Sequence, residues 1–115
     1  MPLLKLETNV AIADSQRQQL QASLSKVVEE ATGKPEQYVM ITIQSSAILM
    51  AGKAGAAALV DLRSIGGLSG EVNRELSKKI CALLSQALSV PPNRVYLNFS
   101  DVSAENWGWG GSTFG

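Results

Sequence analysis

Hydrophobic and polar residues along this chain form two successive blocks, and each block predicts a strand, a helix and another strand. Residues 2–8 predict a strand that begins with proline, where a missing amide donor is tolerated. Apolar residues then recur every three or four positions from Leu20 to Ala31, which predicts an amphipathic helix. Ser15 and Gln18 have capping-box spacing, so we expect Ser15 as the N-cap of this helix and Gly33 as its C-terminal stop.

The remaining chain repeats this order. Residues 38–43 are β-rich and nearly apolar on both faces, which is typical of a central strand. Residues 45–51 are compatible with a short extra strand, and a loop of small residues then leads into a strand over residues 57–64. A second amphipathic helix is expected over residues 71–88, and residues 94–100 predict a further strand.

Two strand–helix–strand units in tandem predict an α+β fold, which we expect to form a single domain over residues 1–115. The expected architecture is a four-stranded mixed sheet with both helices on one face. The other face should be apolar, as residues 39–43 indicate, and another copy of the chain is its simplest partner. Short edge strands in the glycine-rich tail, residues 107–114, would be completed across that subunit boundary.

Composition narrows the classes of partner. Of the 115 residues, 45% are hydrophobic and 17% are charged, which favours a tightly wound domain or a subunit that hides apolar surface in an oligomer. Ten basic residues balance ten acidic ones without a cluster, so neither nucleic acid nor an anionic membrane is an expected partner. We expect no signal peptide, and no apolar run has the length of about 20 residues that spans a bilayer.

Two scarce residue types restrict the chemistry. The chain has no histidine, which removes Ser-His-Asp and Cys-His catalysis and most zinc sites. Its one cysteine, Cys81, lies in an apolar helical pattern and is expected to be a core residue, with no intrachain disulfide. Any catalysis must therefore use amines, carboxylates, hydroxyls or phenols.

The N-terminus offers one such amine. Removal of Met1, which is normal when a small residue follows, would expose the secondary amine of Pro2. A free α-amine has a pKa of about 8, and burial among apolar side chains such as Leu3 and Leu4 would lower it. An uncharged Pro2 nitrogen could act as a general base or a nucleophile, whereas the alternative is a Met-Pro start without function.

Other polar residues have both a structural and a functional interpretation. Lys34 is either a solvated lysine beyond a helix C-terminus or a cation for a substrate carboxylate. The turn from Arg63 to Gly67 precedes a helix N-terminus, which favours anions, but it matches no nucleotide-binding motif. Tyr96 and Asn98 share one face of their strand, either as structural groups or as donors in a pocket. The tail aromatics are typical of a core or an interface more often than of a ligand wall: Trp107, Trp109 and Phe114.

Taken together, these segments resemble the macrophage migration inhibitory factor family of the tautomerase superfamily. The resemblance runs almost from end to end, and the order and spacing of the segments are more specific than any one of them. The matching segments are Met1-Pro2, Thr8-Asn9-Val10, Ala31-Thr32-Gly33-Lys34-Pro35, Gln37-Tyr38, Ser64-Ile65-Gly66, Asn73-Arg74, Arg94-Val95-Tyr96, Gly108-Trp109 and Ser112-Thr113-Phe114.

The resemblance implies a homotrimer with active sites at subunit interfaces, and keto–enol tautomerisation of phenylpyruvate-like α-keto acids without metal or cofactor. It implies that Pro2 shuttles the proton while Lys34 and the Ile65 backbone amide hold the carboxylate or oxyanion. The other site residues would be Tyr38, Ser64, Trp109 and Phe114, with Tyr96 and Asn98 contributed by the neighbouring subunit.

The chain departs from the family pattern in three places. Where the vertebrate cytokine has a Cys-Ala-Leu-Cys motif, this chain has Ala57-Ala58-Leu59-Val60, so thiol redox activity is not expected. Arg63 stands in place of a histidine and would add positive potential near the site. Trp107 stands in place of a small aliphatic residue at the pocket mouth and would narrow the pocket.

The sequence leaves three functions open. A tautomerase is favoured because Pro2, Lys34 and Ile65 are retained together with the pocket residues. The alternative is a cytokine-like signalling protein of the same fold, which would bind a protein receptor and have weak catalysis. A dehalogenase or hydratase relative would call for further arginines or acids in the pocket. Without a signal peptide we expect a cytoplasmic protein, and the resemblance adds leaderless secretion as a second destination.

Overall fold

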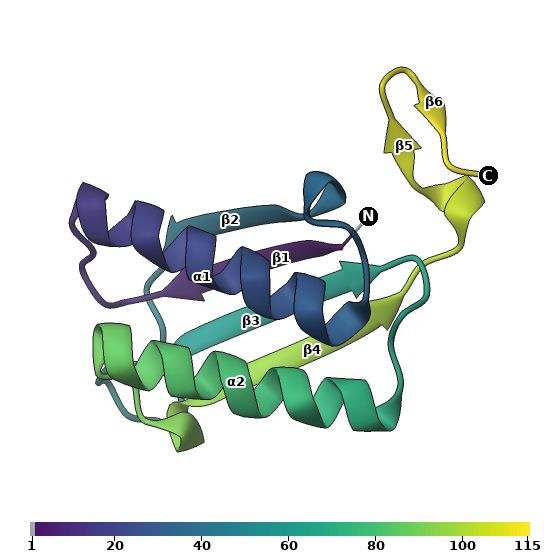
Figure 1. The fold of residues 1–115 in the computed structure, drawn as a ribbon. Coiled ribbons are helices and arrows are strands. Elements are labelled where there is room, and N and C mark those ends of the chain that lie inside the picture. Colours follow the sequence, from purple (N-terminus) through teal and green to yellow (C-terminus); the bar gives the residue numbers. More distant parts are fainter. Residues whose placement is uncertain (1) are drawn as a thin grey trace.

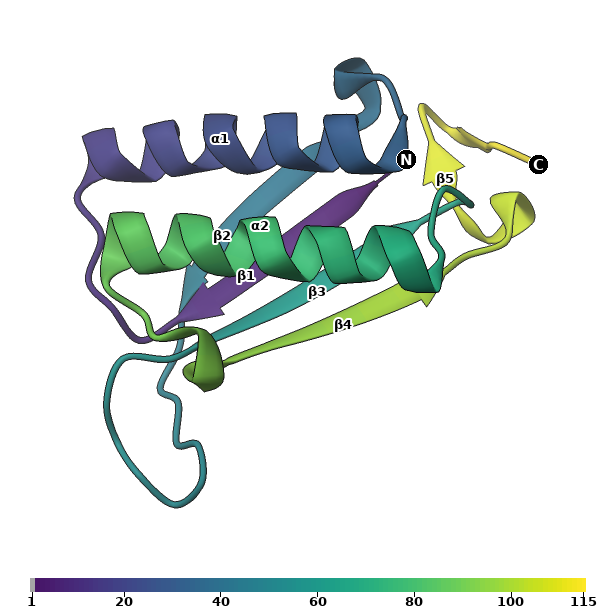
Figure 2. The ribbon, with the colours of Figure 1, turned by 60° about the horizontal axis from the view of Figure 1, so that its bottom comes forward.

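The computed structural model describes residues 2–115, so the expected removal of Met1 lies outside the described residues. A four-stranded sheet in the order β2-β1-β3-β4 forms one layer, and two helices lie side by side across one of its faces (Figure 1 and Figure 2). The strands are β1 (Leu3–Thr8), β2 (Met40–Ser45), β3 (Ala58–Ser64) and β4 (Val95–Asp101), and the helices are α1 (Asp14–Thr32) and α2 (Gly70–Leu88).

Strand pairing confirms the predicted mixed sheet. β1 and β2 are parallel and connected through α1, and β3 and β4 are parallel and connected through α2. The two units meet where β1 and β3 pair antiparallel at the centre of the sheet. A small hairpin of β5 (Gly108–Trp109) and β6 (Ser112–Thr113) projects beyond the sheet, at the end where β1 begins (Figure 1).

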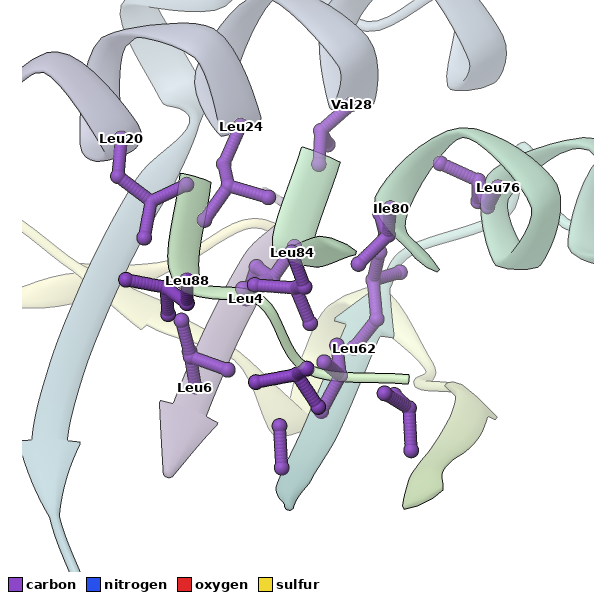
Figure 3. Close-up of a cluster of buried hydrophobic side chains, with 14 residues drawn as sticks. Leu4, Leu6, Leu20, Leu24, Val28, Leu62, Leu76, Ile80, Leu84 and Leu88 are labelled. Atoms are coloured by element: carbon purple, nitrogen blue, oxygen red, sulfur yellow. The ribbon is translucent and has the colours of Figure 1, made fainter. Parts of the chain in front are cut away.

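The core lies between the helices and the sheet. Leu20, Leu24 and Val28 of α1 form the predicted apolar stripe, and the facing residues of β1 are Leu4 and Leu6 (Figure 3). The remaining core residues labelled in that view are Leu62, Leu76, Ile80, Leu84 and Leu88. Each fully buried leucine stabilises the fold by roughly 1.5–3 kcal/mol, so this layer is the main source of stability.

The N-terminus of α1 corrects one prediction. The helix begins at Asp14 with Ala13 as its N-cap, so Ser15 lies inside the helix and is not the cap. The Arg17 amide donates to the Ala13 carbonyl, and the Arg17 guanidinium pairs with the Asp14 carboxylate at 2.7 Å. A carboxylate in the first turn favours the positive end of the helix dipole, which compensates for the missing side-chain cap. The C-terminal prediction is confirmed, since Gly33 is the left-handed C-cap.

β2 is an edge strand, so the prediction of a central strand is wrong. Ile41 and Ile43 pack on the core, but Met40, on the opposite face, is 62% exposed. The predicted extra strand in residues 45–51 is also absent from the described residues, where Met50 forms only an isolated bridge with Lys53. A run that is apolar on both faces can equally belong to an edge strand, if the face turned away from the core is left to pack against a partner.

The sheet face away from the helices is less apolar than expected. The register aligns Thr42, Lys5, Asp61 and Asn98 in one row across all four strands of this face. These side chains are all at least partly exposed. The open face therefore carries charged and amide side chains among its apolar residues. A contact with another copy through this face would not be purely hydrophobic.

Candidate active site

Pro2 lies at the start of β1 and is one of the fully buried residues. Its carbonyl accepts a hydrogen bond of 3.0 Å from the Met40 amide, which fixes it beside β2. Pro2 borders a cavity of about 480 Å³. The other residues that line this cavity are Leu3, Gln37, Tyr38, Val39, Met40, Arg63, Val102, Asn106, Trp107, Gly108, Trp109 and Phe114.

Three aromatic rings form one wall of the cavity. Trp109 and Phe114 are stacked with ring centroids 5.7 Å apart, and Tyr38 meets them edge-on at 6.2 and 6.1 Å. The Phe114 amide also donates to the Trp107 carbonyl at 3.1 Å, which closes the hairpin segment on itself. Tyr38 comes from the short helix η1 (Glu36–Tyr38) and the other rings from the C-terminal segment, so only the fold brings this wall together.

η1 is held to α1 by a cluster of charged residues. The Glu36 amide donates to the Glu29 carboxylate at 2.9 Å, and Lys26 pairs with the Glu36 carboxylate at 2.9 Å. Hydrogen bonding to Lys26 lowers the pKa of Glu36, and the same bond raises the pKa of Lys26. These contacts fix the segment between Lys34 and Tyr38 against the end of α1.

Lys34 lies immediately after Gly33, where the chain leaves α1. Its backbone amide donates to Thr32 Oγ1 at 3.3 Å, and its side chain extends over the turn at Gly66 and Gly67. The Lys34 ammonium does not line the cavity. The turn over which its side chain extends comes directly after Ile65 in the sequence. The fold thus places Lys34 beside the turn that carries the Ile65 amide.

The turn itself is built by short polar contacts. The Ser64 side chain is fully buried and donates to the Gly66 carbonyl at 2.7 Å. The Gly66 amide donates to the Asp101 carboxylate at 2.9 Å. Ser64 therefore lies under the turn and outside the cavity wall, and the Gly66 amide already has an acceptor. Extending the β1–β3 register by one residue places Pro2 opposite Ser64, next to this turn.

Arg63 reaches the cavity from the open face of the sheet. It pairs directly with Leu3 in the register, one residue from Pro2, and its side chain is 49% exposed. Its guanidinium forms an ion pair with Asp61 at 2.9 Å, so its charge is partly compensated within the chain. Trp107 is half-buried and lines the same cavity.

Tyr96 and Asn98 lie apart from the Pro2 cavity in a single chain. Both project from β4 on the open face, and Tyr96 is 67% exposed. Tyr96 lines a second cavity of about 420 Å³, together with Leu59 and the loop of residues 46–51. That loop leaves the sheet at the end opposite the hairpin (Figure 2). Within one chain, neither Tyr96 nor Asn98 therefore lines the Pro2 cavity.

Several residues around the cavity were not found by sequence reasoning. Val102 and Asn106 line it, and Asp101 shapes the adjacent turn. Gln37 belongs to one of the matched segments, so only its position in the Gln-Tyr pair could have indicated it. Among residues 2–115, no group of three or more His, Cys, Asp or Glu side chains could hold a metal ion. No helix in this described part of the chain is both long and apolar enough to cross a membrane.

Comparisons with known proteins agree over the full length. The family model for macrophage migration inhibitory factor (MIF) matches residues 1–115. Macrophage migration inhibitory factor of Rattus norvegicus is 40% identical over 115 residues, covering 99% of both chains. The crystal structure of the homologue from Prochlorococcus marinus is 36% identical, with a TM-score of 0.93, covering 98% of this chain and 99% of that one. The MIF-like protein from Entamoeba histolytica is 30% identical with a TM-score of 0.94, covering 98% of each chain.

Proposed function

This chain belongs to the macrophage migration inhibitory factor family, and from that premise we propose that it is a keto–enol tautomerase of phenylpyruvate-like α-keto acids. The observation that carries the proposal is the position of Pro2, which is buried and borders a cavity with an aromatic wall. Burial lowers the pKa of an amine, and an uncharged prolyl nitrogen is the form that accepts a proton. The wall of Tyr38, Trp109 and Phe114 suits a phenyl ring.

In the proposed reaction, the Pro2 nitrogen takes a proton from the carbon next to the keto group. The electrons of the broken C–H bond form the carbon–carbon double bond, and the carbonyl oxygen becomes an enolate oxygen. The proton is then delivered to that oxygen and Pro2 is regenerated uncharged; the reverse sequence converts enol to keto acid. Lys34 and the Ile65 amide would hold the carboxylate or the developing oxyanion. No cofactor enters this cycle.

The proposal includes a homotrimer whose neighbouring subunit supplies Tyr96 and Asn98. Their separation from Pro2 in one chain and the exposure of Tyr96 support this arrangement. The exposed edge of β2 at Met40 and the exposed hairpin ring of Trp109 are further apolar surface that a second copy would cover. In this scheme Ser64 shapes the turn, Arg63 adds a guanidinium to the rim of the cavity, and Trp107 narrows the cavity.

Replacing the ring-held secondary amine of Pro2 with the primary amine of glycine, which no ring holds in place, tests the assignment. We expect Pro2→Gly to reduce phenylpyruvate tautomerisation by at least about a hundredfold, since a positioned general base contributes a factor of about 10² to 10⁴. Intact-mass measurement first establishes that Met1 has been removed. Pro91→Gly, a change at an exposed proline that does not line the cavity, is the matched control and should retain activity. Full turnover by a correctly folded Pro2→Gly protein would refute the assignment.

The same experiment separates the two family functions. A processed protein that lacks Met1 and yet does not turn over any enolisable aromatic acid would favour the cytokine-like alternative. In that case the cavity would be vestigial and an exterior surface would bind a protein receptor. Turnover that depends on Pro2 favours the enzyme.

A further inference from the structure

We propose that Gly67 is a positioning residue for Lys34: its missing side chain leaves the space in which the lysine lies and so sets where the ammonium meets a substrate carboxylate. The inference rests on the proposed function, because it takes Lys34 as the group that binds the carboxylate. Gly67 does not line the cavity and would act only through Lys34.

The backbone of Lys34 is fixed from the side of α1. Thr32, the last residue of the helix, is buried; its hydroxyl donates to the Val28 carbonyl at 2.6 Å and accepts from the Lys34 amide at 3.3 Å. Gly33 turns the chain through the left-handed region with φ 72°. The side chain of Lys34 therefore begins from a fixed point on the backbone.

Gly67 closes this space from the other side. A Cβ on Gly67 would lie 3.0 Å from the Thr32 carbonyl oxygen and 3.1 Å from Lys34 Cε. The backbone carbonyl of a capped helix end cannot easily yield, whereas Cε is near the flexible end of a lysine side chain. An added methyl group would therefore displace the end of Lys34, next to the ammonium, and its contact with the Thr32 carbonyl oxygen would in addition require a small shift between the turn and the helix end.

The turn that carries Gly67 cannot simply move away. The Gly66 amide is held by the Asp101 carboxylate, and the Gly66 carbonyl by the Ser64 hydroxyl. The Val102 amide donates to the Ser64 carbonyl at 2.9 Å, which ties the turn to the end of β4. Because the end of α1 and the turn are both held by hydrogen bonds, the missing side chain of Gly67 leaves the space that the end of Lys34 occupies.

Other glycines provide matched controls for backbone strain. Gly67 has φ +76°, and any L-residue there is strained whatever the space. Gly52 has φ +70° with nothing within 4 Å of its Cβ position, so Gly52→Ala introduces the same kind of strain without a contact. Gly66 has φ +69°, and its Cβ would meet only Lys34 Nζ at an ordinary 3.9 Å. Gly66→Ala is therefore a control at the adjacent position, where the added methyl group makes a weaker contact with Lys34.

The kinetic test compares Gly67→Ala with these controls on phenylpyruvate. A misplaced ammonium weakens a charge-assisted contact, so we expect KM to rise about tenfold in Gly67→Ala. The change in kcat should be smaller, and Gly66→Ala should show a lesser rise in KM. Gly52→Ala should match the wild type. Because Gly67 would act only through Lys34, adding Gly67→Ala to Lys34→Met should change KM less than twofold.

A second measurement is independent of turnover. The ¹³Cε signal of Lys34, assigned by its loss in Lys34→Met, should shift in Gly67→Ala and not in Gly52→Ala. The proposal is overturned if this signal is unmoved in folded Gly67→Ala, or if Gly67→Ala is as harmful in the Lys34→Met background as in the wild type. Absent phenylpyruvate turnover in the wild type would instead count against the proposed function, and the signal would still decide the positioning of Lys34.

Discussion

Arg94 offers the sharpest test of how the loop beside Tyr96 is held. Its guanidinium donates to four backbone carbonyls of the loop between β2 and β3: Ala56 at 2.9 Å, Lys53 at 3.0 Å, Met50 at 3.3 Å and Gly55 at 3.4 Å. Because one side chain holds four carbonyls, Arg94→Met should release the whole loop from the base of β4 at once.

The expected loss of stability follows from the burial of these bonds. Those to Ala56 and Met50 are partly buried and those to Lys53 and Gly55 are exposed, so only the first two should contribute substantially. Hydrogen bonds to charged groups contribute roughly 1.5–3 kcal/mol each, and allowing for the long Met50 bond gives about 2–4 kcal/mol in total. At about 4 °C per kcal/mol for a domain of this size, Arg94→Met should lower Tm by roughly 8–16 °C.

Two assays follow the two consequences. Thermal unfolding by circular dichroism at a fixed protein concentration measures Tm, since the stability of an oligomer depends on concentration. Limited trypsin digestion with mass spectrometry measures cleavage after Lys53, whose carbonyl is one of those that Arg94 holds. Cleavage at that bond should accelerate in Arg94→Met. Lys78→Met is the control, because Lys78 is exposed on α2 and forms no ion pair among the described residues.

A Tm loss in Arg94→Met no larger than that in Lys78→Met would refute the reasoning, because the four bonds would then add nothing to stability. So would a large Tm loss without faster cleavage at Lys53. That result would show Arg94 stabilising the fold by some other route than the loop.

Two further predictions concern the charged cluster at η1 and the subunit interface. Lys26 lowers the pKa of Glu36, so the pair should stabilise the fold above the ordinary carboxyl pKa of about 4.3 and lose that effect as pH falls through the lowered value. Urea unfolding should therefore show Glu36→Gln less stable than wild type at pH 7 and equal to it well below pH 4; an equal difference at both would contradict this. If Tyr96 completes the neighbour's site, unfolding and refolding Tyr96→Ala together with Pro2→Gly should restore activity to at most about a quarter of the sites. No recovery in mixed, assembled trimers would count against the shared site.

Periodicity in the sequence was sufficient for most of the fold. The α1 stripe from Leu20 to Val28 and the Gly33 cap depend on neighbours within four residues, so they could be recognised locally. The Ser15 prediction failed because Asp14 and Arg17 offer an equally local alternative that moves the start of the helix by two residues. The order of the strands could not be predicted locally, since an apolar run such as residues 40–43 does not indicate whether its strand will pair with one neighbouring strand or two.

The candidate site was predicted only in part. Chemistry made Pro2 and Lys34 candidates and only the resemblance gave them roles; the structure places the first at the cavity and the second beside the adjoining turn. The closeness of Gly67 to Thr32 and Lys34 brings a turn against the end of α1 and leaves no local signature. The ion pair of Arg63 with Asp61, by contrast, lies within β3 between residues two positions apart. The distance between Tyr96 and the Pro2 cavity could likewise be learned only from the folded chain.

The sequence by itself determined which groups are present: a proline able to become an N-terminal amine, no histidine, and two amphipathic helices of matching length. The tertiary structure decided which of those groups meet. Tyr38 and Phe114 are separated by about two thirds of the chain, and yet their ring centroids lie 6.1 Å apart. Such contacts depend on strand order and on the packing of both helices over one sheet face, which arise from burial of the whole core and cannot be read from any short segment.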